Sequence, residues 1–146
     1  MVQIVTDPLA LANELRPVLL RLARLLRREA ADLGVTAGQA SFLSAIGERP
    51  GITARELADR ERISPPGMSA HLDRLEAADL IVRTRGTDRR RVGLALSPKG
   101  KRVLKRVRAK RTAWLAERLQ GLEAEELAAI DAAIEPLGRL LEQEVA

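Results

Sequence analysis

The sequence of 146 residues predicts a mainly α-helical α+β fold with a β-hairpin set among its helices. Three observations predict it. Two short helices with clear start signals follow one another between residues 53 and 78, and two segments of strand composition flank an arginine-rich turn between residues 80 and 96. An apolar seam with helical spacing lies near each end of the chain. Two helices joined by a turn and followed by a hairpin form a winged helix-turn-helix.

The first helix is predicted to begin at Asp7-Pro8 and to run to about Asp32, with Gly34 ending it. Pro17 lies inside this helix and removes one hydrogen bond, so we expect a kink there. The apolar seam steps by four and three residues, close to a coiled-coil pattern: Leu11, Leu15, Val18, Leu22 and Leu25. The remaining face is basic and is interpreted first as a solvated surface: Arg16, Arg21, Arg24, Arg27 and Arg28.

A second helix is predicted to start with a capping box at Thr36 and Gln39. Its inward side is expected to consist of Phe42, Leu43 and Ile46. A turn follows at residues 49–51, and residues 52–53 are expected to add a short third strand beside the hairpin.

The helix-turn-helix begins with another capping box, in which the Thr53 hydroxyl accepts the Glu56 amide and the Glu56 carboxylate reaches back to the Thr53 amide. Ser64 and Pro65 then start the second helix, since Ser is a favoured cap and Pro fits the first helical position. The buried stripe of this helix is expected at Met68, Leu72 and Leu75. Its opposite face is small and polar, which suits entry into a major groove. Asp79 occupies the position after the helix, where the left-handed conformation is common.

The turn between the two predicted strands carries four arginines in the seven residues 85–91. Neighbouring like charges repel, so this cluster adds nothing to the stability of a β-hairpin. A polyanion offsets that cost through phosphate contacts and counterion release, and a narrow minor groove also attracts arginine. The hairpin is therefore predicted to be a DNA-binding wing.

A long helix is predicted to start at Ser97-Pro98 and to reach about Gln120. Its first half, residues 99–111, is densely basic and either forms a solvated face or adds phosphate contacts beside the wing. Gly121 ends this helix, and a last helix follows, with a predicted kink at Pro136. The last apolar seam steps by three and four residues: Leu127, Ile130, Ile134, Leu137 and Leu141.

The segment LDRLEAADLIVRTRGTDRRRVGLALSPKGKRVL, residues 72–104, resembles the multiple-antibiotic-resistance regulator (MarR) family of bacterial transcription factors. The likeness lies in the end of the recognition helix, the Asp-x-Arg wing pattern at Asp88 and Arg90, and the Leu-Ser-x-x-Gly junction that begins at Leu96. These motifs occur in the family's order, and the resemblance covers essentially the full length. It implies a dimeric winged-helix regulator of transcription, one that often responds to small aromatic anions bound between the dimer helices and the winged domain.

We expect a single MarR-type domain over residues 1–146, with the winged helix-turn-helix at 34–98 and helical dimerisation parts at 1–33 and 99–146. The terminal apolar seams exceed what a small winged helix needs, and burial against a second copy would protect them. A two-fold dimer presents two recognition helices to a pseudo-palindromic operator, with half-sites about one DNA turn apart.

The predicted DNA contacts come from the start of the helix-turn-helix, the outer face of its second helix, and the wing. They are Thr53, Ser64, Pro65, Pro66, Ser69, Ala70, His71, Asp73, Arg74, Arg83, Arg85, Thr87, Asp88, Arg89, Arg90 and Arg91. Because the helix face has few long donors, readout is expected to lean on van der Waals contact and DNA shape. Asp88 is expected to pair with Arg90 and hold that side chain toward the minor groove.

Two further residues have alternative interpretations. His71, the single histidine, either packs at the edge of the domain or contacts phosphate or base, and a metal or catalytic role has no second group to complete it. Trp114, the single tryptophan, either packs in the core or dimer contact or lines a ligand pocket. We favour packing for both side chains.

Composition narrows the class of partner. The excess of 25 Lys and Arg over 20 Asp and Glu suits a nucleic acid, and one Phe, one Trp and no Tyr leave no aromatic platform for single strands, so duplex DNA fits better. The lack of cysteine excludes disulfides, zinc fingers and thiol sensing within this chain, and no metal or cofactor is expected. No apolar run of membrane-spanning length and no signal peptide are found, so a soluble cytoplasmic protein is expected.

The sequence therefore predicts a sequence-specific regulator of transcription that binds double-stranded DNA, and not an enzyme. We expect a homodimeric repressor that a small aromatic or anionic effector releases, as the family resemblance implies. The alternative is a ligand-independent architectural DNA-binding protein, which would show a small ratio of specific to non-specific affinity.

Overall fold

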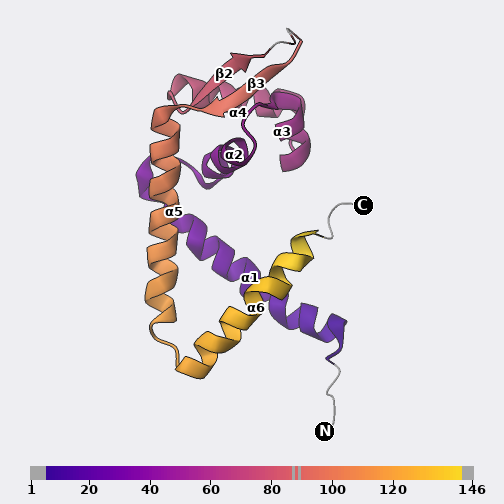
Figure 1. The fold of residues 1–146 in the computed structure, drawn as a ribbon, viewed down its shortest axis with the longest axis vertical. Coiled ribbons are helices and arrows are strands. Elements are labelled where there is room, and N and C mark those ends of the chain that lie inside the picture. Colours follow the sequence, from indigo (N-terminus) through magenta and orange to yellow (C-terminus); the bar gives the residue numbers. More distant parts are fainter. Residues whose placement is uncertain (1–5, 87, 89, 143–146) are drawn as a thin grey trace. The chain divides into compact units, whose positions relative to one another are not determined.

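In the computed structural model, which describes residues 6–86, 88 and 90–142, helices supply most of the backbone and three short strands form one antiparallel sheet (Figure 1). The elements in chain order are α1 (Pro8–Arg28), the 3-10 turn η1 (Ala31–Leu33), α2 (Ala37–Glu48), β1 (Ile52–Thr53), α3 (Ala54–Glu61), α4 (Pro65–Ala77), β2 (Ile81–Arg85), β3 (Val92–Leu96), α5 (Pro98–Leu119) and α6 (Ala124–Glu142). The mainly α-helical winged helix-turn-helix fold is thereby confirmed.

The chain divides into two units, Met1–Arg111 and Thr112–Ala146. The first unit therefore extends into α5, beyond the residues 34–98 that the sequence assigned to the winged helix-turn-helix. The second unit contains the end of α5 and all of α6. No helix among the described residues is long and apolar enough to cross a membrane.

The first helix is shorter than predicted. It ends at Arg28 and not near Asp32, because the Glu29 amide bonds back to the Leu26 carbonyl and the chain then tightens into the 3-10 turn η1. Ala30, just after the helix, is thereby buried in the core. Asp32 lies within η1, where its carboxylate accepts a hydrogen bond from Lys110 of α5, and this bond lowers the pKa of Asp32. Gly34 ends η1 and not the helix, with a left-handed φ of 81°.

The core of the first unit is built where α2, α3 and α4 meet the sheet and the start of α5. The predicted stripe of α4 is fully buried, with Met68, Leu72 and Leu75 each at 0% exposure. The predicted inward side of α2 is buried as well: Phe42, Leu43 and Ile46. Both caps expected before these helices are present, a complete capping box at Thr36 and the Ser64 hydroxyl that accepts the Gly67 amide.

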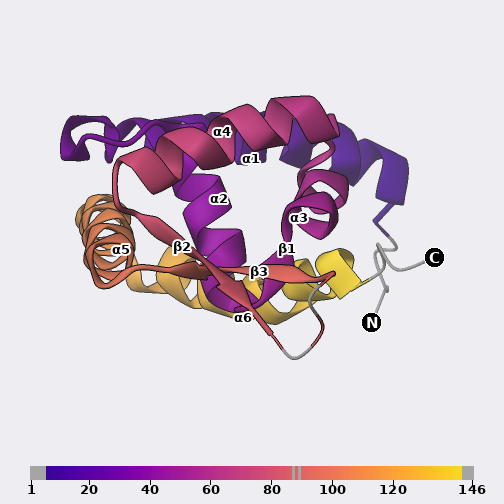
Figure 2. The same cartoon turned by 90° about the horizontal axis from the view of Figure 1, so that it is seen from above.

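The sheet has the strand order β1-β3-β2, and residues 52–53 do form the short third strand that the sequence predicted. Ile52 pairs with Leu94 and Arg85 pairs with Val92, so β2 and β3 form a two-stranded ribbon that extends away from the helices packed at its base (Figures 1 and 2). Gly93 permits the close approach of the turn before β1, since a Cβ there would lie 2.9 Å from the Gly51 Cα atom.

The junction between α4 and α5 is held by backbone bonds and one buried hydroxyl. Asp79 adopts the predicted left-handed conformation with a φ of 59°. Its amide bonds to the Glu76 carbonyl and the Leu80 amide bonds to the Leu75 carbonyl, which is the Schellman arrangement at a helix end. The Ser97 hydroxyl donates to the Asp79 carbonyl at 2.5 Å and accepts the amide that begins the first turn of α5.

Replacing Asp79 with glycine is expected to raise the free energy of unfolding by about 0.5–1 kcal/mol, because glycine adopts a left-handed conformation without Cβ crowding. Urea unfolding monitored by circular dichroism measures the change. Asp59→Gly in the interior of α3 is the matched control and should lower stability by a similar amount, since glycine weakens a helix. A loss of stability in Asp79→Gly would show that the Asp79 carboxylate stabilises the fold by more than the left-handed backbone at this residue destabilises it.

Candidate nucleic-acid interface

Helix α4 turns its predicted DNA-facing side to solvent. Most of the predicted contacts on this helix and at its cap are exposed: Ser64, Pro65, Pro66, Ser69, Ala70, Asp73 and Arg74. The opposite side of the helix holds the fully buried stripe described above. The helix is therefore fixed to the core along one side while small and polar groups cover the other side. Such a face can approach base edges closely, because few long side chains stand in the way.

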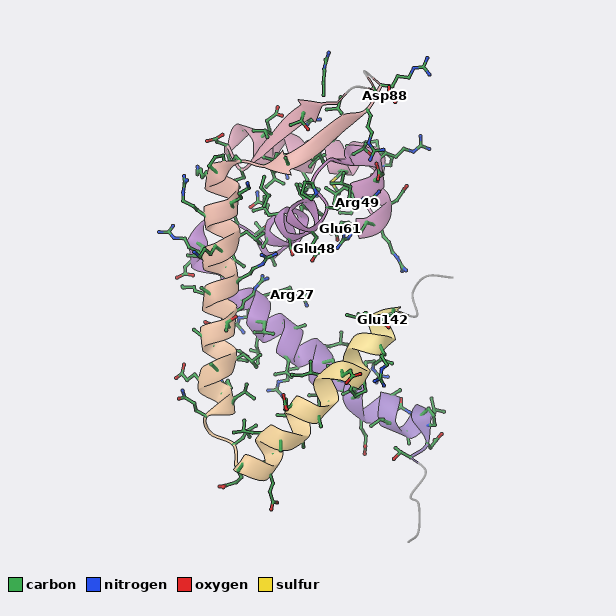
Figure 3. The ribbon with its side chains drawn as sticks, viewed as in Figure 1. Arg27, Glu48, Arg49, Glu61, Asp88 and Glu142 are labelled. Carbon is green, nitrogen blue, oxygen red and sulfur yellow. The ribbon has the colours of Figure 1, made fainter. Side chains whose placement is uncertain are left out.

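The wing presents exposed cations at its tip. Arg85, Arg90 and Arg91 are exposed, and Asp88 lies at the hairpin tip (Figure 3). Thr87 and Arg89, also predicted contacts, lie outside the described residues. The expected pairing of the Asp88 and Arg90 side chains is not found. The Asp88 carboxylate instead accepts the backbone amide of Arg90 at 3.0 Å, because in a tight turn that amide lies nearer than the long guanidinium group.

Arg83 joins β2 to the recognition helix α4. Its guanidinium group donates to Asp73 and to Glu76, both at 3.0 Å. The predicted contacts Arg83 and Asp73 thus lie together and partly offset each other's charge. Together these ion pairs fix β2, the first strand of the wing, relative to α4.

A second cluster lies around Glu56 at the start of α3. Its carboxylate accepts from Arg91 at 2.6 Å, from Arg49 at 2.8 Å and from the Thr53 hydroxyl at 3.0 Å. The Thr53 hydroxyl in turn accepts the Glu56 amide, as predicted, but the carboxylate bonds to that hydroxyl and not to the predicted Thr53 amide. The Thr53 hydrogen bond, aided by the charges of Arg91 and Arg49, lowers the pKa of Glu56. Sequence reasoning missed this cluster, since its members are far apart in the chain.

The single histidine packs at the edge of the domain. His71 is half-buried, and its ring centroid lies 5.1 Å from that of Phe42 in α2. Among the described residues, no group of three or more His, Cys, Asp or Glu side chains is placed to hold a metal ion. Trp114, in the second unit, is half-buried and has the Arg118 guanidinium group 4.8 Å from its ring centroid, a cation–π contact.

Part of the basic run in α5 serves the fold. Lys99 donates to the Ala78 carbonyl at the end of α4, and Lys110 donates to Asp32. Arg111 donates from its Nε atom to the Leu26 carbonyl at the end of α1. These three cations therefore connect α5 to other segments of the first unit, and the other basic residues from Lys101 to Arg108 are exposed.

A basic cavity of about 670 Å³ lies in the first unit between the end of α1, the first half of α2 and Arg111 of α5. Its walls combine polar and apolar groups, including Ser41, Phe42 and Ile63. Its charged residues are two cations, Arg27 and Arg111, and one carboxylate, Glu61 (Arg27 and Glu61 are labelled in Figure 3). Burial, together with the charge of Arg27, lowers the pKa of Arg111. The two arginines outnumber the single carboxylate of the lining, which favours an anion.

An exposed helix face backed by a buried stripe, next to a ribbon with cations at its tip, defines the winged helix-turn-helix class of DNA-binding proteins. Comparison with known proteins agrees. A profile of the MarR family matches residues 33–91. An HTH-type transcriptional regulator of Mycobacterium leprae is 33% identical over 116 residues, which is 79% of this chain and 81% of the relative. The HTH-type transcriptional repressor MdtR of Bacillus subtilis is 35% identical over 95 residues, 64% of this chain and 61% of MdtR.

Among solved structures, a transcriptional regulator from Pseudomonas aeruginosa has a TM-score of 0.79 and 37% identity, and the match covers 94% of this chain and 96% of that one. The chain belongs to the MarR family of DNA-binding transcriptional regulators. The relatives are regulators of transcription and not enzymes, in agreement with the sequence prediction.

Proposed function

We propose that the protein is a homodimer that binds a pseudo-palindromic site in double-stranded DNA, with α4 in the major groove and the wing in the adjacent minor groove. The observation that carries this proposal is the division of α4 into a fully buried stripe and an exposed face of small and polar side chains. In this proposal that face and the wing arginines contact bases and phosphates, and Thr53 and His71 are further predicted contacts.

Dimerisation is supported by the terminal helices, since neither α1 nor α6 has a buried residue within a single chain. Large apolar side chains on both helices are instead strongly exposed, among them Leu9 at 70%, Leu20 at 61%, Ile134 at 64% and Leu141 at 74%. Large apolar side chains exposed to this extent along a helix mark an interface. In the proposed dimer a second copy covers these faces, and the two-fold axis pairs two recognition helices with two half-sites.

Selection from random DNA duplexes tests the proposal. The expected result is a pseudo-palindromic consensus with half-sites about one turn apart, bound on the order of 10³-fold more tightly than scrambled DNA. Affinity for both duplexes is then measured across a salt series. A flat preference with a steep salt dependence would contradict the proposal and favour the architectural alternative, in which the protein only holds phosphates.

We also propose that the protein represses transcription and that a small anion releases it from DNA. The relative MdtR is named as a repressor, and the basic cavity supplies a place for the anion. Two arginines and one carboxylate line a partly apolar space there, and a carboxylate on an aromatic ring matches the excess of cations and the apolar walls. The anion shifts the dimer away from the DNA-binding arrangement by binding the other arrangement more tightly.

Replacing Arg27 with glutamine is expected to weaken the binding of benzoate, used as the probe anion, by about tenfold, because a charge-assisted hydrogen bond is lost. Calorimetric titration of the dimer measures the affinity, and displacement from the selected duplex measures release. Arg21→Gln, which removes a cation of α1 outside the cavity, is the matched control and should bind benzoate as the unchanged protein does. Equal affinities in the two variants would contradict the assignment of the cavity.

A further inference from the structure

Glu56 connects three segments at the loop end of the β2–β3 ribbon. Its Oε1 atom accepts from Arg91, just before β3, and from the hydroxyl of Thr53 in β1. Its Oε2 atom accepts from Arg49, in the turn after α2. The Glu56 side chain is 26% exposed, so these contacts are partly shielded from solvent. One carboxylate thus holds two arginines from segments that are distant in the sequence.

Apolar packing is sparse at this end of the ribbon. Strand β3 pairs with β1 at Gly93, where a Cβ would lie 2.9 Å from the Gly51 Cα atom and 3.2 Å from the Thr84 hydroxyl. Val92, the first residue of β3, is only half-buried, and Arg85 opposite it is exposed. The ribbon therefore receives little support from side-chain packing there. Ion pairs take that place, with Arg83 joining β2 to α4 and Arg91 joining β3 to α3.

We propose that Glu56 is a positioning residue for DNA recognition, which fixes the wing through Arg91, and that Arg91 is therefore not one of the phosphate-binding arginines. This inference rests on the proposed function, because it assigns separate tasks to arginines of the proposed DNA contact. Arg90 supplies the contrast. Its side chain is exposed and, among the described residues, has no ion-pair partner, so it is free to enter the minor groove.

The two kinds of arginine differ in how their loss changes the salt dependence of binding. Each phosphate contact contributes about 0.9 to the slope of log affinity against log salt concentration. Arg90→Gln should therefore lower that slope by about one. Arg91→Gln should leave the slope unchanged and weaken operator binding by about fivefold, since it loosens the wing without removing a phosphate contact. An equal fall of the slope in both variants would overturn the proposal.

Glu56→Gln tests the same ion pair by changing the carboxylate and not the arginine. The substitution leaves Arg49 and Arg91 without their shared carboxylate, so affinity for scrambled DNA should rise while the ratio of operator to scrambled affinity falls about fivefold. Asp59→Asn removes the same charge from the exposed side of α3 and should leave that ratio unchanged. The double variant Glu56→Gln with Arg91→Gln should lose no more of the ratio than either single variant, because the two residues act through one contact. Additive losses, or equal ratios in Glu56→Gln and Asp59→Asn, would overturn the proposal.

A measurement without DNA separates this inference from the proposed function. Hydrogen exchange of the backbone amides at the Arg85–Val92 end of the ribbon should be faster in Glu56→Gln than in Asp59→Asn, while the amides of α2 exchange equally in both. If the unchanged protein shows no operator preference, the proposed function fails. Faster exchange in Glu56→Gln would still support the inference that Glu56 fixes the wing. Equal exchange in the two variants overturns it, whatever the protein does on DNA.

Discussion

Replacing Gly100 with alanine is expected to lower the free energy of unfolding by about 3 kcal/mol or more, one of the largest effects of a single methyl group in this chain. A Cβ atom at Gly100 would lie 2.0 Å from the carbonyl oxygen of Leu80 and 3.0 Å from its carbonyl carbon. Both contacts are to backbone, which cannot rotate away as a side chain can. The Leu80 carbonyl also accepts a hydrogen bond from the Ser97 amide, and the Leu80 amide donates to the Leu75 carbonyl. Any shift of Leu80 would therefore break the hydrogen bonds at the end of α4.

Urea unfolding measures the loss, and Gly38→Ala is the matched control. Gly38 lies in the first turn of α2, where the contact found for an added Cβ is the Thr36 hydroxyl at an ordinary 3.9 Å. That variant should keep its stability or gain about 0.5 kcal/mol from helix propensity. A loss below about 1 kcal/mol in Gly100→Ala would show that α5 can move away from the recognition helix at little cost.

Local signals in the sequence predicted much of the fold for a physical reason. The Ser64 cap and the left-handed Asp79 depend only on groups within a few residues of them in the chain. A short stretch of sequence therefore contains everything that determines these two features. The buried stripe of α4 follows from helical spacing, and all three of its members are fully buried. The strands were located because the segments on each side of the arginine-rich turn are rich in β-branched and other apolar residues.

The features that the sequence did not reveal depend on distant partners. Glu56 lies 35 residues before Arg91 in the chain, and the strand register places them together. The same holds for Lys110 and Asp32, whose contact accompanies the early end of α1. The basic cavity joins Arg27, which the sequence pattern assigned to a solvated face, with Arg111, which lies in a run interpreted either as a solvated face or as phosphate contacts. The arginine-rich composition thus indicated a DNA-binding protein. Only the ion pairs in the structure distinguish arginines held by carboxylates, such as Arg91, from exposed ones such as Arg90.

Replacing Ile134 with glutamate is expected to weaken dimerisation by at least about 100-fold, because the two-fold axis would bury the new charge twice in an apolar contact. Ile134 is 64% exposed in the single chain and lies on the same side of α6 as Leu127, Ile130 and Leu141. Analytical ultracentrifugation measures the change as a shift from the dimer to the single-chain mass. Operator affinity should fall with it, since one winged domain reaches only one half-site.

Ala132→Glu provides the matched control, because it adds the same charge to α6 on the side opposite Ile134, where Glu135 and Arg139 form an exposed ion pair. That variant should remain a dimer and keep its operator affinity. The two variants together separate a specific apolar interface from a general effect of negative charge on DNA binding. If Ile134→Glu stays dimeric at micromolar concentration, the apolar side of α6 is not the contact between copies. The strongly exposed apolar residues of α1 would then be the remaining candidate for it.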